Sequence, residues 1–451
     1  MAKRHPNILL LAIDSLRRDY MSCYGYPKPT TPQMDRLAAE GVLVENSFSA
    51  YVPTTPGYTS MLTGRDVIAT QMVSLHPLGP MDPEQPTLPE LLREAGYIST
   101  CVGHNDFYRG FDEYLQFSGW GGGWEQRPAP KADSLNETAI PAMERMHASG
   151  KPWLLFLRHM DPHSPYMPPA PFDTMFYSKD PCDKDLPDTM KPVFDFAPFA
   201  EYIASWLPPG IRDKDFVLAQ YAGAVAYMDA CIQRLITRVS ELGVEEDTLI
   251  VVTSDHGETL YDHECWFDHH GLYECTLTVP LIFRWPGKVP AGVRSKAMTL
   301  EQDLLPTILD LCGLKSVAKG VKFDGKSTVP YFKDTEATPR SEFYISECTW
   351  MRKQGWRTPI WKFWEALEPD FHGKPPVELY NIVEDPEELN NLAKKEPRIV
   401  ETLRGRMNAW IEKRCRETGK GNPILDHEIG LDRRIGSVAA AQKLQDHNDK
   451  K

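Results

Sequence analysis

Short apolar runs with strand character alternate with amphipathic stretches along most of the chain, and this alternation constrains the fold more than any other feature. The runs are almost continuous in apolar residues, as expected for strands buried on both faces. They cover residues 8–13, 98–102, 153–157, 249–253 and 280–283. The clearest amphipathic stretch, residues 216–242, has the apolar period of a helix. The pattern predicts an α/β fold with a mostly parallel sheet between helical layers.

The chain has 451 residues, more than a single hydrophobic core usually holds, so we expect a large domain and a smaller one. The alternating pattern predicts that residues 1–340 form the larger domain. Residues 168–210 lose the pattern and predict an insertion, either a lid or pocket wall or a surface excursion. Residues 341–432 predict a small C-terminal α+β subdomain. Residues 433–451 are polar and predict either a frayed tail or an arm that docks on another subunit. A homo-oligomer is therefore possible from the sequence.

The net charge of −13 argues against a nucleic-acid partner and against binding to anionic membranes. It leaves room for a small anionic substrate, because a bound metal can supply local positive charge. The sequence shows no apolar run near the ~20 residues of a membrane span and no signal-peptide pattern. We therefore expect a cytoplasmic protein.

The nine cysteines are scattered, odd in number and without a CxxC pair. Free thiols in a reducing compartment explain them better than a disulfide framework. Cys265 and Cys275 flank the pair His269 and His270 and could bind a metal. Buried thiols are the simpler interpretation of these two cysteines, and we favour it.

Three segments far apart in the sequence carry the residue types of a metal-activated nucleophile. Thr54 opens a Thr-Thr-Pro-Gly turn, Asp14 ends the first apolar run, and Asp255 with His256 follows a later one. Each segment alone is an ordinary turn or loop. Because ligands of such sheets bind at the carboxyl ends of strands, the three segments together predict a site that joins a hydroxyl, two acids and an imidazole.

The chain is identified by its motifs as similar to a known family. The motifs include Ser254-Asp255-His256-Gly257-Glu258, and the others occupy residues 14–20, 30–38, 54–64, 110–113, 161–166, 271–274, 279–282, 303–307 and 378–381. In this order and spacing they resemble the sulfatase branch of the alkaline phosphatase-like hydrolase superfamily over nearly the whole length. The resemblance implies an alkaline phosphatase-like fold and hydrolysis of anionic esters.

The resemblance also implies one divalent metal held by Asp14, Asp255 and His256, with the Thr54 oxygen completing the site. Carboxylate oxygens suit Mg²⁺, Ca²⁺ and Mn²⁺, and an imidazole shifts the balance towards Mn²⁺ or Zn²⁺. We expect Mn²⁺, with Ca²⁺, Zn²⁺ and Mg²⁺ as alternatives.

The chain departs from the family at the nucleophile. Sulfatases carry Cys or Ser at the position of Thr54, oxidised to formylglycine, and Arg at the position of Tyr58. Threonine cannot give formylglycine by that route, so none is expected, but its alkoxide can attack phosphorus. The expected function is a metal-dependent hydrolase of phosphodiesters or phosphonate monoesters through a covalent threonine intermediate. The alternatives are a sulfatase and a phosphoryl or phosphoglycerol transferase.

Histidines stand where the family has lysines. His104 replaces one lysine, and either His269 or His270 replaces the substrate-binding lysine, while His163 matches a family histidine directly. An imidazole can donate to a substrate oxygen or protonate a leaving group near neutral pH. We therefore predict catalytic roles for His163, His269 and His270, and substrate binding by His104 and Tyr58.

Overall fold

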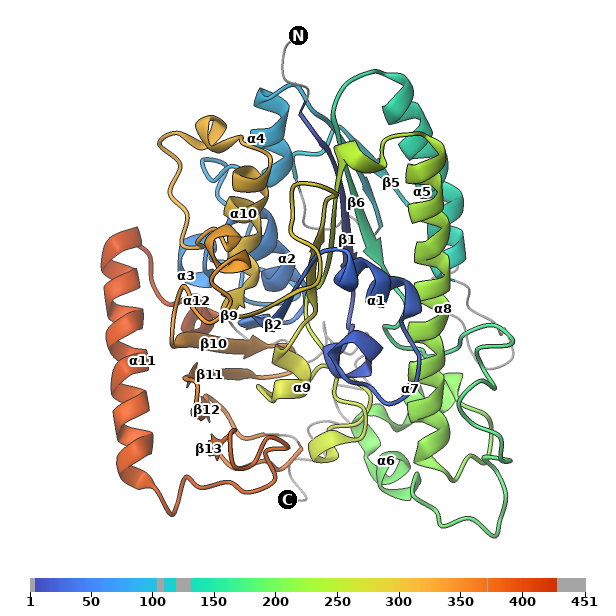
Figure 1. Ribbon diagram of the computed structural model, residues 1–451. Coiled ribbons are helices and arrows are strands. Elements are labelled where there is room, and N and C mark those ends of the chain that lie inside the picture. The colour runs from blue at the N-terminus through green and yellow to red at the C-terminus, as the bar shows by residue number, and fades with distance from the viewer. Residues whose placement is uncertain (1–4, 104–108, 119–130, 371, 428–451) are drawn as a thin grey trace.

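The computed structural model describes residues 5–103, 109–118, 131–370 and 372–427 (Figure 1). Its larger sheet has eight strands in the order β5-β4-β6-β1-β7-β8-β2-β9. These strands are β1 (Asn7–Ile13), β2 (Val42–Phe48), β4 (Ile98–Val102), β5 (Glu113–Leu115), β6 (Trp153–His159), β7 (Thr248–Ser254), β8 (Leu281–Arg284) and β9 (Val293–Leu300). The central strand β1 pairs in parallel with β6 and β7, and β8 runs antiparallel to both of its neighbours.

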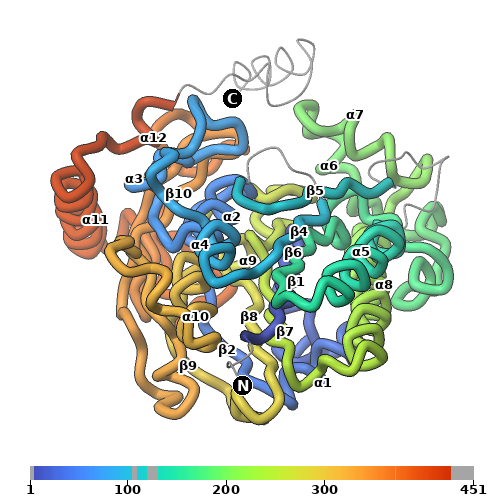
Figure 2. Tube along the Cα trace, turned by 90° about the horizontal axis from the view of Figure 1, so that it is seen from above, coloured from blue at the N-terminus to red at the C-terminus, as the bar shows by residue number. Residues whose placement is uncertain are grey.

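Helices cover both faces of this sheet (Figure 2). One face carries α1 (Pro32–Ala39), α5 (Lys131–Ala148) and α8 (Lys214–Glu241), and the other carries α2 (Thr54–Thr63), α4 (Leu88–Glu94) and α10 (Leu304–Leu311). Along β1, Leu9 and Leu11 pack in the first layer while Ile8 and Leu10 pack in the second. The alternation of side chains in a strand therefore explains why β1 is apolar throughout.

A second sheet has the order β13-β12-β11-β10-β3. Its strands are β3 (Tyr51–Val52), β10 (Phe343–Cys348), β11 (Arg352–Arg357), β12 (Trp361–Ala366) and β13 (Val377–Asn381), and α11 (Pro397–Thr418) packs against it. The short strand β3 comes from the N-terminal part of the chain and pairs in parallel with β10. Thr54 follows β3 closely and so lies where the two sheets meet.

The remaining helices are short: α3 (Val67–Thr70), α6 (Lys191–Asp195), α7 (Ala197–Trp206), α9 (Glu274–Leu277) and α12 (Pro423–Asp426). Within the predicted insertion, Phe196, Phe199 and Trp206 are buried in the same core cluster as Tyr166. These three aromatic residues therefore contribute to core packing. Among the described residues, no helix is both long and apolar enough to cross a membrane.

The α/β fold and its mostly parallel sheet are confirmed, and the five predicted strands are present within two residues of their predicted ends. The prediction of a turn at Thr54 is wrong, because this residue begins α2. The domain boundaries stay predictions. The predicted tail and the end of the predicted subdomain lie outside the described residues.

Candidate active site

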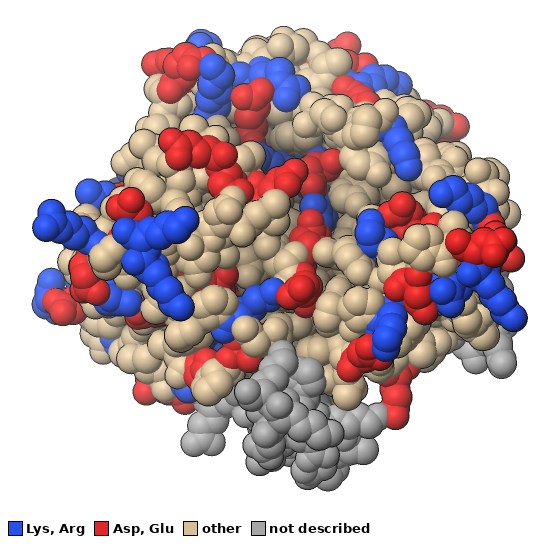
Figure 3. Space-filling view, turned by 90° about the horizontal axis from the view of Figure 1, so that it is seen from below, with Lys and Arg blue, Asp and Glu red and all other residues tan. Residues whose placement is uncertain are grey.

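Asp14 and Asp255 lie at the carboxyl ends of neighbouring strands. Asp14 follows β1 and Asp255 follows β7, and the pairing of Ile13 with Ser254 brings the two acids to the same level of the sheet. Both are completely buried. Asp255 accepts the Ser15 backbone N–H through Oδ1 at 3.2 Å, so the turn after one strand holds the acid of the other. Figure 3 views the molecule from this side, and acidic side chains with some basic ones lie in a hollow near its middle.

The His256 ring presents an unprotonated nitrogen to the two acids. Its Nδ1 lies 2.7 Å from the Gly257 carbonyl, which can only accept, so Nδ1 carries the proton. Burial lowers the pKa of His256 to about 4, so the ring is neutral at pH 7. Its Nε2 lies 3.1 Å from Thr54 Oγ1, 3.5 Å from Asp255 Oδ2 and 3.9 Å from Asp14 Oδ1.

Thr54 reaches this cluster because α2 packs directly on the end of β7. Every residue of α2 is buried. A Cβ added to Gly57, in the first turn of α2, would lie 2.8 Å from the Asp255 carbonyl oxygen. The glycine therefore lets the helix approach closely, and the positive end of the helix faces the site.

The cluster fits a divalent cation. One donor atom each from Asp14, Asp255 and His256 lies within 4.8 Å of the others. Among the described residues, Asp255 Oδ2 has no hydrogen-bond partner although it is buried. Burial and the nearby Asp14 raise the pKa of Asp255 well above its usual value, as expected for two buried acids that share no cation. Two carboxylates and an imidazole form a donor set that suits Mn²⁺ and similar ions.

Arg158, at the end of β6, belongs to the site and was missed in the sequence. Its Nη2 and Nε lie 2.6 and 3.1 Å from Asp14 Oδ2, and its guanidinium lies 5.3 Å from the centre of the Tyr58 ring. Burial alone would raise the pKa of Asp14, but Arg158 and the nearby histidines hold it well below its usual value. The sequence feature that could have revealed Arg158 is a charged residue at the end of an otherwise apolar strand.

His269 and His163 line the same cluster. The His269 ring centre lies 4.5 Å from that of His256 and 6.2 Å from that of His163. Burial lowers the pKa of His269, but Asp268 and Glu258, 3.2 and 3.7 Å from its Nδ1, outweigh this and raise it to about 10. His269 is therefore an imidazolium, a cation where the family has a lysine.

Two other predicted site residues, His270 and Tyr58, make contacts of a different kind. His270 points away, and its ring nitrogens lie 3.3 Å from Glu347 and 3.4 Å from Asp370. Tyr58 is completely buried, and its hydroxyl donates to the Ala12 carbonyl at 3.3 Å. These contacts place both residues in the protein interior, and the roles of His270 in catalysis and of Tyr58 in substrate binding stay predictions. The predicted position of His104 lies outside the described residues.

The fold and the site define a hydrolase of the alkaline phosphatase-like superfamily with a hydroxyl beside a group of side chains that could hold a metal ion. Residues 6–314 match the family described as Sulfatase, and residues 262–413 match "N-sulphoglucosamine sulphohydrolase, C-terminal". The first match covers more than half of the chain. The chain therefore belongs to the sulfatase family, and the resemblance seen in its motifs is confirmed.

Individual relatives agree with this assignment. An N-acetylglucosamine-6-O-sulfatase of Bacteroides thetaiotaomicron is 24% identical, with 89% of this chain and 86% of the relative covered. The N-acetylgalactosamine-6-sulfatase of Canis lupus familiaris is 27% identical over 78% of this chain and 70% of its own length. The structure of a phosphonate monoester hydrolase from Silicibacter pomeroyi has a TM-score of 0.72 at 22% identity, covering 92% of this chain and 96% of that one. At that identity it supports the fold alone.

Proposed function

We propose that this protein is a divalent-metal-dependent hydrolase of sulfate esters in which Thr54 is the attacking group. The main observation behind this proposal is the position of Thr54 Oγ1. It lies 3.1 Å from the unprotonated Nε2 of His256 and next to two buried acids. The named curated relatives support sulfate esters, the alternative of the sequence analysis, more than they support the phosphorus esters that were first expected.

Asp14, Asp255 and His256 hold the cation in this proposal, with Mn²⁺ as the first candidate. When bound, the cation lowers the pKa of a neighbouring hydroxyl and neutralises charge on the ester oxygens. Thr54 Oγ1, whose proton passes to solvent, attacks the sulfur to form a sulfated threonine while the bond from sulfur to the alcohol oxygen breaks. Water then attacks the same sulfur, which releases sulfate and restores the Thr54 hydroxyl. His269 stabilises the anionic oxygens as a buried cation, and His163, at the edge of the cluster, protonates the leaving alcohol.

A second candidate is the hydrolysis of phosphodiesters or phosphonate monoesters, and Thr54 itself favours it. Oxidation of a threonine side chain would give a ketone in place of the aldehyde of formylglycine. The enzyme proposed here therefore works with an unmodified alcohol, which forms and releases a phosphate ester more readily than a sulfate ester. The same residues perform the same two displacements on phosphorus.

Matched aryl esters separate the two candidates. The full-length protein is loaded with Mn²⁺, and kcat/KM is measured for 4-nitrophenyl sulfate, bis(4-nitrophenyl) phosphate and an aryl phosphonate monoester. We expect the sulfate to have the highest kcat/KM. A higher value for either phosphorus ester would replace the first candidate with the second. Peptide mass spectrometry of the same sample checks that Thr54 carries an unmodified side chain.

A further inference from the structure

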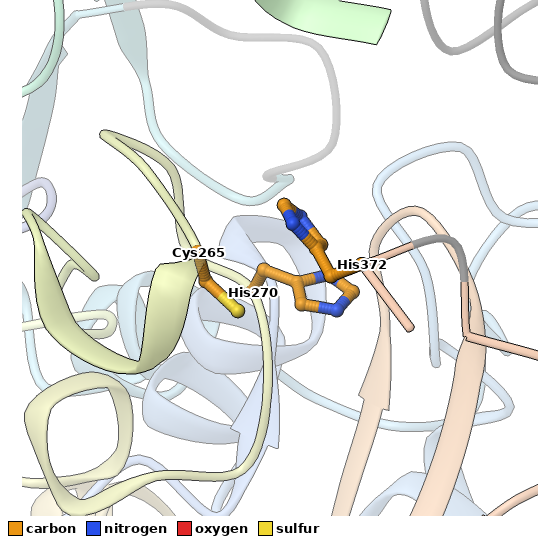
Figure 4. A group of neighbouring side chains, drawn as sticks. All are labelled: Cys265, His270 and His372. Carbon is orange, nitrogen blue, oxygen red and sulfur yellow. The ribbon is translucent and has the colours of Figure 1, made fainter. Parts of the chain in front are cut away.

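A further group of side chains that could hold a metal ion consists of Cys265, His270 and His372 (Figure 4). Cys265 and His270 come from the loop before α9, and His372 comes from the connection between β12 and β13. One donor atom from each lies within 4.8 Å of the others. Cys265 and His270 are completely buried, and His372 keeps 9% of its surface exposed. The group thus joins a loop of the larger domain to the C-terminal sheet.

We propose that Cys265, His270 and His372 form a structural zinc site, distinct from the catalytic cation. A thiolate and two imidazoles are the soft and borderline donors that Zn²⁺ prefers, whereas the catalytic cluster offers mainly carboxylate oxygens. The group supplies three protein ligands and leaves a fourth position for water or a neighbouring carboxylate. Zinc binding releases the thiol proton of Cys265, which burial retains in the absence of a cation.

The surroundings orient the two imidazoles as zinc ligands require. His270 has Glu347 Oε1 at 3.3 Å from Nδ1 and Asp370 Oδ2 at 3.4 Å from Nε2, so a carboxylate can fix whichever nitrogen is not bound to zinc. The His372 ring stacks on Phe196 with the centres 4.5 Å apart and the planes at 12°. Stacking occupies a face of the ring, and one ring nitrogen of His372 lies within 4.8 Å of the donor atoms of Cys265 and His270.

Two buried acids and a buried lysine surround the group. Asp370 is paired with Lys353 at 2.7 Å, and both are buried. Glu347 is completely buried and accepts the Gly271 N–H through Oε2 at 3.0 Å. Its Oε1 has no hydrogen-bond partner among the described residues. Zinc would add a second positive charge beside these two carboxylates, next to Lys353, whose Nζ lies 3.5 Å from His270 Nε2.

The position of the site gives the zinc a role. His270 directly follows His269, the cation of the active site, so a metal on His270 would fix the loop that carries both. Zinc would then hold His269 in place without touching the substrate. This inference does not depend on the ester that the enzyme hydrolyses.

The test is metal analysis of the full-length protein after incubation with Zn²⁺ and dialysis against metal-free buffer. Wild type should retain a zinc ion that Cys265→Ser loses. Cys275→Ser is the matched control, since Cys275 flanks the same histidine pair outside the group, and it should keep the zinc. Asp255→Asn should also keep it while losing the catalytic cation. The proposal fails if wild type holds no zinc beyond the catalytic cation or if Cys265→Ser retains the full amount.

Cobalt gives a readout that does not require a variant to fold. Wild type loaded with Co²⁺ should show the near-ultraviolet absorption of a thiolate–cobalt bond, and Cys275→Ser should show the same band. Absence of that absorption in cobalt-loaded wild type would overturn the assignment of Cys265 as a ligand.

Discussion

At the scale of single residues, the positive charges of the site come from unexpected positions. Where the family has a lysine, His269 is kept cationic by Asp268 and Glu258. Tyr58 is buried at the position where the family motif has an arginine. The guanidinium of Arg158, from β6, lies over the Tyr58 ring and donates a hydrogen bond to Asp14. The structure thus places an imidazolium and a guanidinium beside the candidate metal ligands.

The proposed role of the positive charge on His269 can be tested by replacing the imidazolium with the ammonium group of lysine. Because the proposed role requires a positive charge, His269→Lys should keep most of the wild-type kcat/KM, whereas His269→Ala should lose roughly 10²-fold. Steady-state kinetics on the best aryl ester measure both variants. Equal activity of His269→Ala and wild type would show that this charge does not act on the substrate.

Arg158→Met removes the guanidinium from Asp14 Oδ2 while keeping an unbranched apolar chain. Loss of a group that orients a metal ligand lowers activity by about 10–100-fold, and we expect a decrease in kcat/KM of this size. Mn²⁺ titration of the same variant shows whether the loss arises from weaker metal binding. Wild-type kcat/KM in Arg158→Met would rule out a positioning role.

Part of the candidate site could be predicted from the sequence. Asp14, Thr54, Asp255 and His256 could be predicted because strand ends and motif positions place them. Arg158 could not, since its contact with Asp14 spans 144 positions and depends on the pairing of β1 with β6. The choice between His269 and His270 also needed the structure, because the two neighbours face different clusters.

At the scale of elements, the approach of α2 to β7 sets the geometry of the site. Strands with continuous apolar runs could be predicted, but β2 and β9 were missed because polar residues interrupt them. The helical start at Thr54 was missed because Thr-Thr-Pro-Gly is also a common turn sequence. Burial of the whole of α2 overrides that local preference.

Gly57→Ala tests the approach of α2. The added methyl group would meet the Asp255 carbonyl at 2.8 Å, so we expect a lower kcat/KM and a free energy of unfolding reduced by about 1–3 kcal/mol. Denaturant unfolding and kinetics measure the two effects. Gly405→Ala, at an open position of α11, is the control and should raise the free energy of unfolding by about 0.5–1 kcal/mol. Unchanged activity in Gly57→Ala would show that the helix tolerates displacement.

At the scale of the whole molecule, the two sheets share a core. The cluster that contains Phe48 and Val52 from the N-terminal part also contains Phe343, Trp364 and Leu403 from the C-terminal part. Strand β3 belongs to the second sheet although it precedes α2 in the chain. The C-terminal region therefore supports the start of the helix that carries Thr54.

This shared core predicts that residues 1–340 alone do not form an active protein. Truncation leaves β3 without its partner β10 and exposes apolar residues of the common cluster, so we expect aggregation or loss of cooperative unfolding. Calorimetry should show a single transition for the full-length chain. A soluble fragment of residues 1–340 with full activity would demonstrate that the regions are independent.

The central claim is that a cation held by Asp14, Asp255 and His256 turns the Thr54 hydroxyl into the attacking group. Its most direct test is Thr54→Ala, measured for turnover of the best aryl ester and for bound metal in the same preparation. The claim predicts a loss of turnover of more than about 10³-fold, with the cation still bound by the remaining three residues. Wild-type turnover in Thr54→Ala would contradict it.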